Sequence, residues 1–161
     1  MQGMLMMWMM YLNMLARYIK QPQFPFAFQK FLYSHCHSNS QITPMSLEEH
    51  VWFDGKIHVF HSVIAQFYAP SDLCGAGGMH HECICANQLW YGEAAHNDTV
   101  FVSLDESQPG MYGMLVACVL LFFSFYDPYL KENIACALVN WFVPVEDEPD
   151  DVIGMWVVHP E

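Results

Sequence analysis

The first twenty residues carry large apolar side chains at helical spacing. The positions are Leu5, Trp8, Leu12, Leu15 and Ile19, which follow one another at steps of three and four residues. Side chains at such steps share one face of an α-helix. The pattern predicts an amphipathic helix within residues 1–20, which packs on the domain or on a protein partner. Its apolar part is shorter than the ~20 residues of a membrane span, so no membrane insertion is expected.

Prolines and a polar stretch separate this helix from the rest of the chain. Pro22 and Pro25 lack a backbone donor and push their neighbours toward extended geometry, so we expect residues 21–28 not to be helical. A helical turn is predicted over residues 29–33, and the polar residues that follow are typical of a linker. We therefore divide the chain into a helical segment at 1–33, a linker at 34–50 and a β-rich domain at 51–161.

From residue 51 onward the pattern changes to that of β-strands. Runs rich in β-branched and aromatic residues cover 57–69, 99–104, 114–126, 134–145 and 153–158, with short polar turns between them. The predicted fold is mainly β with an N-terminal helix, an α+β class in which an antiparallel sheet forms a small barrel or sandwich. The apolar run that ends at residue 126 lacks basic flanks, which favours a buried strand over a membrane span.

Composition and charge narrow the functions that the chain can have. Of its 161 residues 54% are hydrophobic and 14% are charged, which is typical of a chain that folds around a core. The net charge is −12 and Arg17 is the single arginine, so nucleic acid is expected to bind poorly. Six cysteines without a secretory signal pattern indicate reduced thiols and an intracellular location.

A histidine- and cysteine-rich stretch follows a glycine-rich turn, in the sequence GAGGMHHECIC. One interpretation is a transition-metal site, because imidazole and thiolate are metal ligands. On a strand His81, Cys83 and Cys85 would share a face, and Cys74 or His96 would have to complete the site. The spacing differs from the C-x2-C pairs of zinc knuckles. We therefore expect no metal or other cofactor, and those three residues remain the candidate ligands.

No arrangement typical of catalysis is found in the sequence. Ser62 follows His61, but no G-x-S-x-G turn places a nucleophile beside a base. The glycines within residues 75–78 lack the lysine and hydroxyl residue of a phosphate-binding loop and are more typical of a turn. We therefore predict that the protein is not an enzyme and has no catalytic residues.

Four stretches of the chain carry a resemblance to a known family. They are FYAPSDLCGAGGMHHECIC, DTVFVSLDESQPGMYGMLVACVLLFFSF, CALVNWFVPVEDEPDD and GMWVVHPE. They resemble the C-terminal region of the large open reading frames of fungal Plavaka-type transposons, distant members of the cut-and-paste CACTA group. The similarity extends from about Trp8 to Glu161. The catalytic acids of the family would lie upstream of this region, so none is carried over.

The chain departs from the family pattern at arginines. In the family GGM is followed by R-R-E-R-I-R, and four further positions hold arginine. The eight residues at these positions here are His58, His80, His81, Cys83, Cys85, His96, Cys118 and His159. A C-to-T change in a CpG-containing arginine codon yields cysteine or histidine. The resemblance therefore implies a degenerate copy in which His80, His81, Cys83 and Cys85 mark a former basic patch.

The resemblance implies a transposon-derived, non-catalytic accessory or interaction domain that lacks the catalytic core. We expect such a remnant inside the cell, and the nucleus is one candidate compartment. An alternative is a β-rich chromatin- or nucleic-acid-binding module, because LFFSF at 121–125 and ALVNWFVPVEDEP at 137–149 resemble the bromo-adjacent homology domain at the level of the fold. A third is a zinc-binding protein that uses His81, Cys83 and Cys85.

Overall fold

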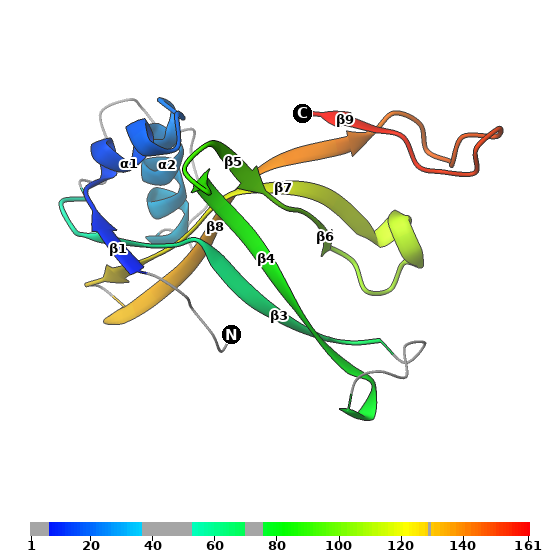
Figure 1. Cartoon of the computed structure of the whole chain (residues 1–161), viewed down its shortest axis with the longest axis horizontal. Helices are drawn as coiled ribbons and strands as arrows, with labels where there is room; N and C mark the ends of the chain where they lie inside the picture. Colours follow the sequence, from blue (N-terminus) through cyan, green and yellow to red (C-terminus); the bar gives the residue numbers. More distant parts are fainter. Residues whose placement is uncertain (1–6, 37–52, 70–75, 129) are drawn as a thin grey trace.

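The computed structural model describes residues 7–36, 53–69, 76–128 and 130–161 (Figure 1). Within these residues the chain is mainly β, with two helices and nine strands, and every strand pair is antiparallel. This confirms the predicted mainly β, α+β class. The helices are α1 (Leu12–Tyr18) and α2 (Phe24–Cys36), and the strands are β1 (Met7–Met10), β2 (Ile57–Phe60), β3 (Ser62–Tyr68), β4 (Met79–Trp90), β5 (Ala94–Asn97), β6 (Thr99–Ser103), β7 (Met114–Asp127), β8 (Glu132–Pro144) and β9 (Val158–Pro160).

The N-terminal helix is shorter than its apolar spacing predicted. Residues 7–10 form strand β1, which pairs with β2 so that Met10 lies opposite Ile57, and the helix begins only at Leu12. The helical prediction was therefore wrong for residues 7–10 and is confirmed for 12–18. Apolar residues at steps of three and four also suit a strand when nearly every residue in the run is apolar. In that case pairing with a neighbouring strand decides the conformation.

Helix α2 begins where the sequence predicted extended chain. It starts at Phe24 and has Pro25 as its second residue, so the prediction for residues 24–28 was wrong. A proline in the first turn costs no hydrogen bond, because the backbone donors there have no partner within the helix. The helix also continues through residue 36, into the start of the predicted linker, whose residues 37–50 lie outside the described part of the chain.

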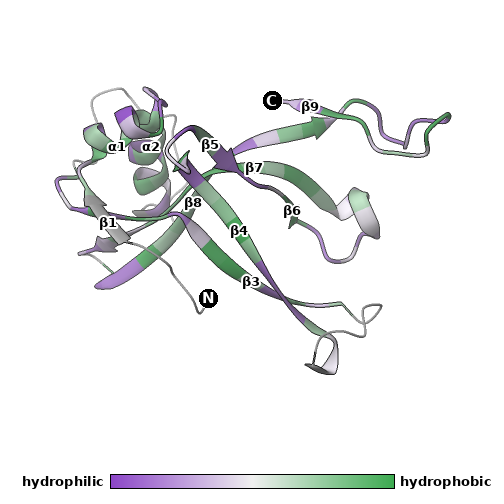
Figure 2. Cartoon of the chain, in the orientation of Figure 1, coloured by the Kyte–Doolittle hydropathy of each residue, from purple (hydrophilic) through white to green (hydrophobic). Residues whose placement is uncertain are grey.

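Two sheets are present in the described residues, and they do not close into the barrel that was one of the two predicted forms. The larger sheet has the order β1-β2-β7-β8-β9, with β6 also paired to β7, and the smaller has the order β3-β4-β5. Apolar residues run along β7 and β8 at the centre of the larger sheet (Figure 2). The predicted strand at 153–158 was wrong except for its last residue, since β9 begins at Val158.

The two sheets meet at a point where strands exchange partners, which we call the strand junction. Only His61 separates β2 from β3, and only Asp98 separates β5 from β6. On one side of these residues the strands pair with β7, and on the other side with β4. Three backbone hydrogen bonds hold the crossing: Ala86 N–H to His61 O at 2.8 Å, Asp98 N–H to Cys85 O at 2.9 Å and Val119 N–H to Asp98 O at 2.9 Å.

The helices and the larger sheet share one hydrophobic core. Helices α1 and α2 lie together against the sheet (Figure 1), and their buried residues belong to the same cluster as buried residues of β2 and β7. Phe28 makes tilted or edge contacts with the rings of Phe24, Phe53, Phe123 and Phe125. The division into segments at 1–33, 34–50 and 51–161 stays a prediction. In the described part of the chain neither helix has the length and apolar character needed to cross a membrane.

Candidate functional site

A hairpin of β4 and β5 brings three potential metal ligands together beside the strand junction. The chain turns back at Tyr91 and Gly92, which both have positive φ, and Asn87 then lies opposite His96. The same register places Cys85 opposite Asp98. Because side chains alternate along a strand, Cys85, His96 and Asp98 all extend from one face of the small sheet.

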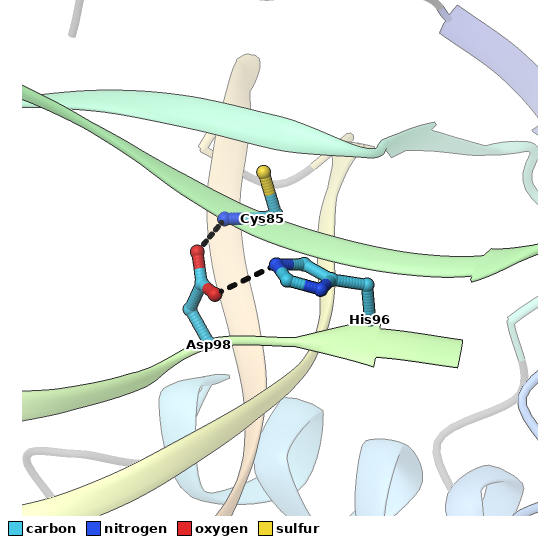
Figure 3. Close-up of side chains that lie close together, drawn as sticks. All are labelled: Cys85, His96 and Asp98. Carbon is cyan, nitrogen blue, oxygen red and sulfur yellow. Dashed lines mark hydrogen bonds and ion pairs between the residues drawn. The ribbon is translucent and has the colours of Figure 1, made fainter. Parts of the chain in front are cut away.

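The geometry of these three residues is compact (Figure 3). One atom from each, the Cys85 sulphur, a ring nitrogen of His96 and a carboxylate oxygen of Asp98, lies within 4.8 Å of the other two. Oδ2 of Asp98 accepts a 2.7 Å hydrogen bond from the Cys85 backbone N–H, and Oδ1 lies 3.0 Å from Nε2 of His96. The carboxylate is thus held between the backbone of one strand and the imidazole of another.

Cys83 extends this group along β4. It is two residues from Cys85 on the same strand face and is exposed, whereas Cys85 is half-buried. Burial raises the pKa of the Cys85 thiol, and the neighbouring Cys83 thiol and Asp98 carboxylate raise it further. A raised pKa keeps the sulphur protonated at neutral pH, so Cys85 lacks the thiolate character of a catalytic nucleophile.

The structure separates the ligand candidates that the sequence had grouped. His81 extends from the same strand as Cys85 but is four residues away, or about 13 Å along an extended chain, which is too far to share one ion. His80 packs against Phe67, with ring centroids 6.0 Å apart. Cys74 lies outside the described residues. Among the candidates in the described part of the chain, Cys85 belongs to the group with His96 and Asp98, and Cys83 lies two residues from Cys85 on the same strand.

Asp98 was missed in the sequence, and His96 was considered only as a remote addition. The signal that would have found them is the pairing of C-x-C at 83–85 with H-x-D at 96–98 across the turn at Tyr91 and Gly92. Both pairs have the period of two that places side chains on one face of a strand. Local ligand spacing cannot reveal this relationship, because the register of the hairpin creates it.

Tyr18 connects helix α1 to the strand junction. Its hydroxyl lies 3.4 Å from Nε2 of His61 and accepts a hydrogen bond from the backbone N–H of Gln88. Burial raises the pKa of Tyr18, an effect that the Gln88 bond partly offsets, and burial also lowers the pKa of His61. Both side chains are therefore uncharged at neutral pH, as a contact between packed elements requires.

Exposed basic and apolar side chains lie on and next to α1 and α2. We call this set the helical surface. Its members are all exposed, and they are Tyr11, Met14, Arg17, Lys20, Phe26, Lys30 and Phe31. Between the two helices lies a shallow cavity of about 470 Å³, with Arg17 and Lys20 in its wall. A surface with these side chains can bind an acidic group and an apolar side chain at the same time.

Comparisons of the chain with protein-family models, with curated proteins and with solved structures found no match. The resemblance to Plavaka-type proteins therefore stays a prediction. None of the eight positions at which the family has arginine is buried in this fold: His58, His80, His81, Cys83, Cys85, His96, Cys118 and His159 are half-buried or exposed. Each position is thus compatible with a long charged side chain whose head group reaches water.

Proposed function

We propose that the chain is a non-catalytic interaction domain, derived from a transposon-encoded protein, whose helical surface binds an acidic segment of a partner protein. The observation that supports this proposal is the separation of charge along the chain. Three of the five basic residues and none of the 17 acidic residues precede residue 37. The helical layer is therefore basic in an otherwise acidic protein.

Exposed apolar side chains lie among these basic residues. Tyr11, Met14 and Phe26 are each more than half exposed, and Arg17 and Lys20 line the cavity between the helices. Aromatic and methionine side chains are typical of binding surfaces, where they supply apolar contact area. A partner segment that alternates carboxylates with aliphatic or aromatic residues complements both features.

A protein segment suits this surface better than nucleic acid does. Phosphate backbones require several well-placed cations, and the helical surface offers one arginine and two lysines. The acidic residues of the rest of the chain would repel a long polyanion, whereas a short acidic peptide can contact the helical surface alone. Binding to the peptide is expected to weaken with salt, because exposed charges are screened.

The proposal can be tested by fluorescence anisotropy with two labelled probes. One is a synthetic peptide that alternates glutamate with leucine and phenylalanine, and the other is a short random-sequence DNA duplex. We expect the protein to bind the peptide and not the duplex at physiological salt. The variant Arg17→Glu/Lys20→Glu/Lys30→Glu should bind the peptide roughly tenfold or more weakly.

The matched control reverses the two remaining basic residues, in the variant Lys56→Glu/Lys131→Glu. Both lysines are exposed and lie outside the helical layer, so peptide affinity should stay close to that of the unaltered chain. Equal losses in the two variants would show that net charge alone governs binding and would exclude a specific surface. Preferential binding of the duplex would favour the nucleic-acid-binding alternative instead.

The transposon origin has a separate test in the genomic DNA around the coding sequence. A remnant of this kind is expected to follow upstream transposon sequence that includes the catalytic region. Its arginine codons should show the depletion of CpG that would have produced His80, His81, Cys83 and Cys85. Unrelated flanking DNA with ordinary CpG content would contradict the origin and leave the interaction test unaffected.

A further inference from the structure

We propose that Cys85, His96 and Asp98 bind one Zn²⁺ ion beside the strand junction. The donors come from two neighbouring strands of the small sheet and from the residue that links β5 to β6 (Figure 3). A thiolate, an imidazole and a carboxylate are ligands that zinc binds in proteins, and a water molecule would complete the tetrahedral site. The site differs from the set His81, Cys83 and Cys85 that the sequence pattern suggested.

The distances are close to those that a bound ion requires. With zinc bonds of about 2.0–2.3 Å, two donors of a tetrahedral site lie roughly 3.3–3.7 Å apart. Nε2 of His96 and Oδ1 of Asp98 are 3.0 Å apart, so an ion could replace the proton between them with a small outward shift. The Cys85 sulphur lies within 4.8 Å of both residues and needs a shift of about an ångström, which rotation about its Cα–Cβ bond provides.

The scaffold holds the donors in place without an ion. The Asp98 carboxylate accepts a hydrogen bond from the Cys85 N–H. The Asp98 backbone is held as well, because its N–H donates to Cys85 O and its carbonyl accepts from the Val119 N–H. The ring of His96 stacks on Trp90, with centroids 4.8 Å apart and planes 27° apart. Fixed ligands lower the cost of assembling a metal site, because little conformational freedom is lost on binding.

The surroundings favour entry of a cation. The side chains of His96 and Asp98 are 45% and 33% exposed, so the donors can be reached from solvent. The Asp98 carboxylate lies between the Cys85 backbone N–H and the His96 ring, so a divalent cation there would meet a negative charge. The ion would join β4 to the link between β5 and β6, and we therefore expect it to stabilise the small sheet.

Native mass spectrometry and cobalt spectroscopy of the full chain test the proposal. The reduced protein, freed of metal with a chelator, should take up one Zn²⁺ per chain. Co²⁺ in place of zinc should give the thiolate-to-cobalt charge-transfer band and the strong visible bands of a tetrahedral site. Zinc should also raise the melting temperature.

Four single variants locate the site. Cys85→Ala and His96→Ala should each weaken zinc binding by roughly tenfold or more and remove the tetrahedral cobalt spectrum. His81→Ala tests the neighbouring histidine on the same strand, and Cys136→Ala removes a thiol packed against the hydrophobic core. Both of these controls should keep the stoichiometry and the spectrum.

Two results would overturn the inference. One is the lack of a tetrahedral cobalt spectrum in the reduced, folded protein. The other is a loss in His81→Ala that equals the loss in His96→Ala, which would place the ion farther along β4. Circular dichroism of each variant distinguishes loss of the site from loss of the fold, and any variant that does not fold is replaced by serine or glutamine at the same position.

Discussion

The side chain of Gln88 on β4 donates a 2.9 Å hydrogen bond to the backbone carbonyl of Leu120 on β7. Leu120 lies at an irregularity of β7, where the register with β8 shifts between Val119 and Leu121. Its carbonyl therefore points away from the regular ladder and obtains its partner from the small sheet. The bond ties the two sheets together next to the strand junction.

Replacement of Gln88 by leucine should destabilise the fold. The variant keeps the size of the side chain but leaves the partly buried Leu120 carbonyl without this donor, which costs about 1 kcal/mol. The melting temperature should fall by roughly 2–4 °C for a chain of this size. Gln66→Leu, on the exposed part of β3, is the matched control and should melt close to the unaltered chain. An equal fall in both would mean that the bond to Leu120 contributes nothing.

Replacement of Gly113 by alanine should destabilise the connection between β6 and β7. The carbonyl of Gly113 accepts hydrogen bonds from the N–H groups of Leu104 and Asp105, which draws the two segments together. A Cβ atom at this buried glycine would overlap the backbone oxygen of Asp105 and would crowd that of Gln108. Backbone atoms cannot rotate away from an overlap as a flexible side chain can, so the chain itself would have to shift. We therefore expect a loss of about 1–3 kcal/mol in the free energy of unfolding.

The control for this substitution is Gly110→Asn, and both variants are measured by chemical denaturation. Gly110 has a φ of +57° and open space around it, a conformation that asparagine tolerates better than other residues do. Gly110→Asn should therefore lower the free energy of unfolding clearly less than Gly113→Ala does. A larger cost at Gly110 would show that backbone conformation, rather than the approach of Asp105, limits this connection.

The sequence predicted the long strands and not the ends of the chain, for identifiable reasons. Along β7 one face is buried and the other is only partly covered, and Ala117, Val119, Leu121, Phe123 and Phe125 mark the buried face at a period of two. The sequence itself is apolar on both faces here, and it was this continuous run of Val, Leu and Phe that predicted the strand without knowledge of the fold. The strand β1 instead depends on its pairing with β2, which no local pattern contains.

The candidate site shows the same limit. Cys83 and Cys85 were visible as a pair because they share a strand face. The position of Cys85 opposite Asp98 depends on the β4–β5 register, which a turn at Tyr91 and Gly92 sets. Tyr91 adopts a positive φ that few non-glycine residues adopt, so its turn lacked the usual sequence signature. The residues of the site could be seen in the sequence, but which of them lie close together in the fold could not be predicted.

Replacement of Phe28 by alanine should destabilise the sheet as well as the helices. Phe28 is 2% exposed, and its ring contacts both Phe123 and Phe125 of β7. Loss of a buried phenylalanine costs about 3–5 kcal/mol through lost burial and the cavity that remains. Because the core is shared, the signals of helix and sheet should melt together at a lower temperature.

The exposed Phe26 in the same helix provides the control, since Phe26→Ala removes a ring from the surface rather than from the core. It should leave the melting temperature nearly unchanged. If Phe28→Ala unfolds the helices while the sheet still melts at its original temperature, the segment 1–33 is an independent unit. A single lowered transition would instead show that the predicted boundary at residue 33 does not divide the fold.

The carboxyl group of Asp105 should titrate below its ordinary pKa of 3.8. The Ser107 hydroxyl donates a 2.6 Å hydrogen bond to Oδ1, and the Ser107 backbone N–H donates one of 2.9 Å. Both bonds favour the ionised form, and the hydroxyl has the larger effect. Because the folded pKa lies below the unfolded one, the stabilisation is present above about pH 4 and is lost as the pH falls through the folded value.

An NMR titration of the side-chain carboxyl carbons measures this pKa directly. In Ser107→Ala the pKa of Asp105 should move up toward its ordinary value but not reach it, because the backbone N–H remains. Asp150 serves as an internal reference: the N–H groups of Val152 and Ile153 lower its pKa, and Ser107 takes no part in those bonds. Its titration should therefore be the same in both proteins. An unchanged Asp105 pKa in Ser107→Ala would assign the shift to the backbone donor alone.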